Sequence, residues 1–271
     1  GALRNLLLAA PNHGGLVRHH SSWLLRLSRT NAADLELVVE LFERYEEHDM
    51  LAGLLEPRND RLSFRLEASY LKALFNSGRF RACAARWARK RELLGFDGEL
   101  ALYGAACSAG WEAQGPGSEG MRRLEAAFEE PGRGVVAARL LLAVSAHRLD
   151  AERYERVLAS LEKWGAARFS DHLGFWRTLA RTGNKSGAIR LAQEFPQSPV
   201  CAGEAIQSAQ FYTELGSRDL ALQVLSRSCQ AFGDSPFLWI AYAHLLIEAG
   251  AWEELRRVAL PEVAQAEGDA A

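Results

Sequence analysis

Strand-forming residues are scarce in this chain of 271 residues: isoleucine and threonine are few, and only 8 prolines interrupt long stretches rich in leucine and alanine. β-Branched residues are enriched in strands, whereas leucine and alanine are strong helix formers. The composition therefore predicts an all-helical protein.

Long apolar runs and a charge excess of one sign are also missing. No run of 18 apolar residues occurs, so we expect no membrane span, and residues 2–10 are too weakly apolar for a signal peptide. The 32 basic and 34 acidic residues leave a formal net charge of −2. Because such a chain has no overall field that attracts polyanions, we expect no nucleic-acid partner. The cytoplasm is the favoured compartment, and the periplasm is possible.

Metal-ligand patterns are absent too. Only four cysteines occur, Cys83, Cys107, Cys201 and Cys229, without a CxxC pair or a nearby histidine at metal-ligand spacing. Two disulfides are conceivable, but we expect reduced, buried thiols. The 7 histidines are scattered. The sequence therefore predicts no metal site and no cofactor.

Catalytic signatures are missing as well. Neither a GxSxG nor an HExxH motif occurs. Lys185–Ser186 resembles the end of a phosphate-binding loop, but Asn184 stands where that motif needs glycine. The glycine-rich residues 115–120 follow no predicted strand. We therefore expect that the protein is not an enzyme, unless residues 111–134 build a site.

A recurring glycine organises what is present. After apolar helical runs, glycine occurs at Gly78, Gly110, Gly183, Gly216 and Gly250, with gaps of 32, 73, 33 and 34 residues. The gap of 73 contains a degenerate unit and an insertion, so the step is about 34 residues. In three units a small residue follows five positions after the glycine: Cys83, Ala188 and Ala221. A small side chain there lets two helices cross closely, and glycine suits the turn between them.

This pattern resembles the tetratricopeptide repeat, a helix–turn–helix unit of about 34 residues. Trp239, Ala243 and Gly250 fall where the family has its tryptophan, small residue and turn glycine, and Tyr212 and Gly216 match one unit earlier. The resemblance covers residues 35–260, best over 64–90 and 169–260. It implies an all-α, right-handed superhelical solenoid of antiparallel helix–turn–helix repeats.

Three regions follow from this reading. Residues 1–34 form a helical cap or eroded repeat, and residues 35–260 form an array of about six hairpins. That array has a loop insertion near residues 111–120, and Pro57 shortens its first unit because proline breaks helices. Residues 261–271 form a flexible tail.

Two charge clusters are expected to be solvated faces. The acidic cluster recurs at three- and four-residue spacing on one helix and consists of Glu36, Glu40, Glu43, Glu46 and Glu47. The basic cluster lies on the second helix of its unit, which faces outward in this family, and consists of Arg79, Arg81, Arg86, Arg89, Lys90 and Arg91. For the acidic cluster, partner binding is the alternative.

The resemblance also places a set of side chains on the concave face, which the first helices line. The set consists of Arg65, Lys72, Asn76, Arg177, Arg181, Gln210, Glu214, His244 and Glu248. Some family members bind a peptide C-terminus through a Lys and an Asn one helical turn apart, but none of the corresponding pairs here reproduces that combination. Arg177 and Arg181 are the favoured partner contacts, since arginine binds carboxylates and phosphates; ordinary solvated surface has equal weight.

These observations predict a non-enzymatic scaffold or adaptor that binds a partner segment along the concave face. The partner is another protein or a neighbouring domain of the same chain, since the sequence reads as part of a larger protein. A regulatory array that binds a small molecule or nucleic acid is the alternative. A homodimer through Trp252, Leu255 and Val258 of the last helix is possible, although these residues are expected to pack on the preceding helix.

Overall fold

The computed structural model describes residues 24–26, 28, 32–58, 62–112, 118–130, 132–195, 199–233 and 235–259. These residues form α-helices and one short 3-10 helix, with no β-strand among them, which confirms the all-α prediction. None of these helices is long and apolar enough to cross a membrane. The chain divides into two compact units, Gly1–Arg148 and Leu149–Ala271, which are described separately.

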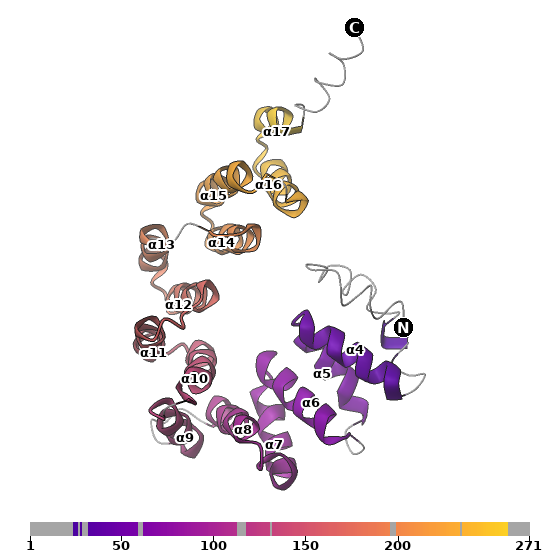
Figure 1. The fold of residues 1–271 in the computed structure, drawn as a ribbon. Helices are drawn as coiled ribbons and strands as arrows, with labels where there is room; N and C mark the ends of the chain where they lie inside the picture. The colour runs from indigo at the N-terminus through magenta and orange to yellow at the C-terminus, as the bar shows by residue number, and fades with distance from the viewer. Residues whose placement is uncertain are drawn as a thin grey trace. The chain divides into compact units, whose positions relative to one another are not determined.

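The first unit is a succession of antiparallel helices in which each helix packs on the next (Figure 1). Its described elements are α4 (Ala32–Arg44), α5 (His48–Leu55), η1 (Glu56–Arg58), α6 (Phe64–Asn76), α7 (Phe80–Leu94), α8 (Gly98–Trp111), α9 (Glu119–Phe128) and α10 (Gly134–Arg148). Helix α8 also contacts α6 and α10, so it lies at the centre of this unit.

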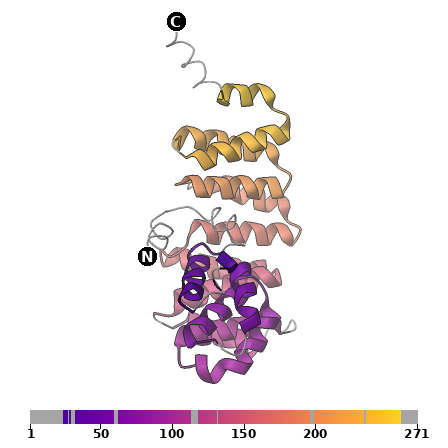
Figure 2. The same cartoon turned by 90° about the vertical axis from the view of Figure 1, so that its right-hand side faces the viewer.

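The second unit consists of hairpins arranged in two rows of helices. Its elements are α11 (Ala151–Lys163), α12 (Phe169–Arg181), α13 (Lys185–Glu194), α14 (Ala202–Glu214), α15 (Arg218–Ala231), α16 (Pro236–Ala249) and α17 (Trp252–Ala259). Helices α12, α14 and α16 form one row and contact one another in order, while α13, α15 and α17 form the other. Seen from the side, the hairpins stack as layers (Figure 2).

The turns explain why these residues form hairpins. Gly78, Gly183, Gly216 and Gly250 all have positive φ angles, between 68° and 99°, at the predicted turns. The left-handed conformation costs a residue with a Cβ roughly 1–2 kcal/mol, so glycine is favoured there. The α10–α11 turn lacks glycine, as its sequence shows, and Leu149 adopts φ 57° in its place.

The small residues of the repeat lie where the paired helices cross. Cys83, Ala188 and Ala221 have no exposed surface, in agreement with the prediction. Each lies in the first turn of the second helix of a hairpin, where a larger side chain would push the first helix away.

Two local expectations have different outcomes. Helix α5 ends at Leu55 and gives way to η1, which contains Pro57, as the proline predicts. Gly110, by contrast, is not a turn residue but lies inside α8. A Cβ at Gly110 would come within 2.1 Å of the Phe80 ring, so this glycine permits close helix packing.

Several other expectations lie outside the described residues. These include most of the cap predicted over residues 1–34, the centre of the insertion at residues 113–117, and the tail over residues 261–271.

The prediction of four reduced thiols is wrong for one pair. Cys83 and Cys107 form a disulfide between α7 and α8, with their Cα atoms 5.4 Å apart. This separation lies within the range that disulfides span. Their sequence spacing of 24 residues gave no motif, because the pairing depends on how the two helices pack. Cys229 is a free, buried thiol as predicted, whereas Cys201 is free but exposed, so the prediction of a buried thiol is wrong there.

Candidate functional site

A groove lies between α14 and α16 in the second unit and has a volume of about 360 Å³. Four of its lining residues belong to the set predicted for the concave face: Gln210, Glu214, His244 and Glu248. Each pair is spaced by four residues on its helix, so both side chains of a pair project from the same helix face. The equivalent register of the two helices in their hairpins therefore brings the two pairs together.

Both carboxylates of this groove contact a basic side chain. Arg177 of α12 donates to Glu214 of α14 through Nε and Nη2, at 3.0 and 2.9 Å from the two carboxylate oxygens. This bidentate geometry fixes the orientation of both side chains. His244 Nδ1 lies 3.4 Å from Oε1 of Glu248, one turn further along the same helix, α16. Because each of these side chains is more than a third exposed, each contact contributes at most about 1 kcal/mol to stability.

Arg181 differs from Arg177 although both lie on α12. Its side chain is exposed, and no described carboxylate forms an ion pair with it. Thus Arg177 already has a carboxylate partner within the protein, whereas Arg181 is available to bind one. The two arginines predicted to contact a partner therefore differ, since only Arg181 lacks a described ion-pair partner within the protein.

The remaining predicted residues lie on α6 in the first unit. Arg65 and Asn76 are exposed, but Lys72 is half-buried and donates a 2.7 Å hydrogen bond to Glu99 of α8. Burial alone would lower the pKa of Lys72, and the bond and charge of Glu99 raise it instead. Lys72 is thus a protonated link between α6 and α8.

The expectation of a solvated basic face fails at Arg86. Its side chain is 1% exposed, and Glu67, its partner on α6, is 0% exposed. Arg86 binds both carboxylate oxygens of Glu67, with Nε 2.8 Å from Oε2. Lys90 Nζ lies 3.5 Å from the same carboxylate, and the guanidinium lies 5.3 Å from the centre of the Tyr70 ring. The prediction was wrong because Arg86 faces α6, not solvent.

The acidic cluster also divides between two environments. Glu36, Glu43 and Glu46 are exposed, as expected of a solvated face, whereas Glu47 is buried at the start of α5. The prediction placed all five residues on one helix, but α4 ends at Arg44 and α5 begins at His48. Glu46 lies in the turn between these helices, with a φ angle of 56°, so the helical spacing does not extend to Glu46 and Glu47.

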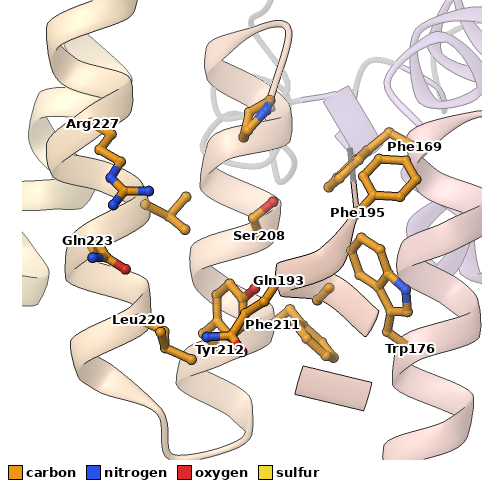
Figure 3. Close-up of a pocket in the computed structure, with 13 residues that line it drawn as sticks. Phe169, Trp176, Gln193, Phe195, Ser208, Phe211, Tyr212, Leu220, Gln223 and Arg227 are labelled. Carbon is orange, nitrogen blue, oxygen red and sulfur yellow. The ribbon is translucent and has the colours of Figure 1, made fainter. Parts of the chain in front are cut away.

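A second cavity in the same unit was not predicted. It lies between the α12–α13 and α14–α15 hairpins and has a volume of about 300 Å³. Aromatic residues dominate one side, with Phe169 and Phe195 next to Trp176, while Leu220, Gln223 and Arg227 line α15 opposite them (Figure 3). Ser208 and Tyr212 of α14 lie between the two sides. The density of aromatic residues in 169–212 was the available signal, but it also fits an ordinary core.

No protein-family model, curated protein or solved structure matches the chain. The structure itself supports a helical-repeat arrangement, and function must be argued from the residues. Among the described residues, no group of three or more His, Cys, Asp or Glu side chains could hold a metal ion.

Proposed function

We propose that the protein is a non-enzymatic scaffold of tetratricopeptide-like repeats, coiled in the right-handed sense of that family, that binds a segment of a protein partner in the α14–α16 groove. The observation that carries the proposal is the convergence of Gln210, Glu214, His244 and Glu248 on one groove of about 360 Å³. The lining also includes Ala209 and Ala241, whose short side chains let a peptide backbone approach the helices.

The charges indicate which segment fits. Glu214 is neutralised by Arg177, while Glu248 contacts only His244 among the ion pairs of the groove. Glu248 therefore leaves acidic character at the α16 end. A partner with a lysine or arginine opposite Glu248 would gain a charge-assisted hydrogen bond, and the amide of Gln210 can donate to and accept from its backbone.

A displayed library of random peptides, selected on the full chain, tests this proposal. Selected peptides should share a basic residue, and Glu248→Lys should weaken their binding about tenfold or more, the usual loss for a hydrogen bond to a charged group. Glu253→Lys is the matched control, because Glu253 is an exposed carboxylate of α17 outside the groove.

A charge swap separates recognition from stability. In Arg177→Glu/Glu214→Arg the ion pair between α12 and α14 can still form, but its polarity is reversed. If the peptide recognises these charges, the swapped variant should lose peptide binding while its helical content stays unchanged. Enrichment of no peptide, or peptides equally tolerant of Glu248→Lys and Glu253→Lys, would rule out this groove as the binding surface.

A further inference from the structure

The aromatic cavity between the α12–α13 and α14–α15 hairpins combines ring walls with one cation. We propose that it binds the C-terminal aromatic residue of a polypeptide, with the ring against Trp176 and Phe195 and the terminal carboxylate on Arg227. This site goes beyond the proposed groove, with which it shares no lining residue, so each can fail without the other.

The ring side is already arranged as an aromatic cluster. Trp176 and Phe195 have centroids 5.3 Å apart at an interplanar angle of 75°, and Trp176 and Phe211 have centroids 5.9 Å apart. Trp176 and Phe211 are 4% and 1% exposed, so they are fixed by the core. Phe169 and Phe195 are only half-buried and leave ring surface accessible. Edge-to-face and offset contacts with such rings favour another aromatic ring over an aliphatic side chain.

The opposite side presents a single positive charge. Of the described residues that line the cavity, Arg227 alone is charged, and no described carboxylate pairs with it. The planar guanidinium matches the two oxygens of a carboxylate. A phosphate monoester carries a charge of about −1.5 to −2, which one arginine would only partly balance. The cavity therefore suits a carboxylate.

The neutral polar residues distinguish a chain end from a free amino acid. No described acidic residue lines the cavity, so the α-ammonium group of a free amino acid would have no counter-charge there. Gln193 and Gln223 offer amide groups that can accept from a peptide N–H and donate to a peptide C=O. The volume of about 300 Å³ lies at the lower end of ligand pockets, roughly 300–1,000 Å³, and accommodates about one residue.

Binding of small acids to the full chain tests the assignment, measured by ligand-observed NMR with titration. The probes are N-acetyl-phenylalanine, its C-terminal amide, N-acetyl-leucine and free phenylalanine. We expect N-acetyl-phenylalanine to bind best. Its amide should bind about tenfold or more weakly, since a hydrogen bond to a charged group is lost.

Two variants locate the binding site. Arg227→Gln should reduce binding of N-acetyl-phenylalanine to the level of its amide, while Arg218→Gln, an exposed position at the start of the same helix, should leave it unchanged. Phe169→Leu should weaken the aromatic probe and spare N-acetyl-leucine. Circular dichroism of each variant checks that the helices remain, and both substituted side chains are at least partly exposed.

Each alternative result overturns a defined part of the proposal. If N-acetyl-phenylalanine and its amide bind equally well, Arg227 does not bind the carboxylate. If N-acetyl-leucine binds as well as N-acetyl-phenylalanine, the cavity does not select an aromatic ring. If free phenylalanine binds as well as N-acetyl-phenylalanine, the ligand is a free amino acid and not the C-terminal residue of a polypeptide. If no probe binds, the cavity is only a packing gap between hairpins.

Discussion

Replacing Arg86 with methionine should destabilise the first unit far more than any surface charge change. The substitution leaves Glu67, which has no exposed surface, without its bidentate partner. Removing one member of a buried ion pair costs about 3–5 kcal/mol. Lys90 remains 3.5 Å from the carboxylate and offsets part of this cost. We therefore expect a loss of about 3 kcal/mol in the free energy of unfolding.

The double variant Glu67→Leu/Arg86→Met provides the decisive comparison. It removes both charges and fills the space with apolar atoms, a change that is often neutral or stabilising for buried pairs. It should therefore be more stable than Arg86→Met alone, which a simple loss of packing would not produce. Arg123→Met is the matched control, because the Arg123–Glu119 pair is 2.7 Å long but largely exposed and contributes at most about 1 kcal/mol.

Urea unfolding followed by circular dichroism measures these differences. Hydrogen exchange over α6 and α7 assigns them to the unit that contains the pair. A loss in Arg86→Met no larger than in Arg123→Met would refute the buried pair. A double variant as unstable as Arg86→Met would refute the electrostatic explanation of that loss.

Three further predictions concern local features. Leu149→Gly should stabilise the α10–α11 turn by about 1 kcal/mol in a denaturant titration, because glycine accepts the φ of 57° without the Cβ penalty; no gain would mean that the turn is not left-handed. Burial lowers the pKa of His172 despite the nearby Glu162 and Asp171. The unfolded chain therefore binds more protons than the folded protein below about pH 6.5, and the stability of the fold decreases as the pH falls below that value. His172→Gln should lessen the decrease in Tm on acidification, and an unchanged pH profile would contradict this. Without reductant, a thiol reagent should modify exposed Cys201 at once and Cys229, whose pKa burial raises to about 11, only after unfolding; four reactive thiols would contradict the disulfide.

Much of the fold could be predicted because its signals are local. Glycine at Gly78, Gly183, Gly216 and Gly250 marks turns whose backbone conformation disfavours other residues. The periodic apolar residues between them specify helices, and the small residues five positions later specify the crossings. The groove residues on α14 and α16 were also accessible, since equivalent positions of successive repeats lie on the same face.

The partners of these residues were not accessible from the sequence. Arg177 and Glu214 are 37 residues apart, and the repeat register gave each a place in the groove without showing that they bind each other. The aromatic cavity could not be predicted either, because its walls come from four helices. The density of aromatic residues in the sequence is also typical of an ordinary core.

The sequence by itself determined that the chain is helical and where its hairpins turn, since helix formation and left-handed turns depend on neighbouring residues. Only the tertiary structure decided which charges are buried. Arg86 and Arg89 lie on the same helix and have the same chemistry, yet Arg86 faces Glu67 of α6 while Arg89 is exposed. The environment of a side chain is set by residues that packing brings to it, and here that partner lies 19 residues earlier in the chain.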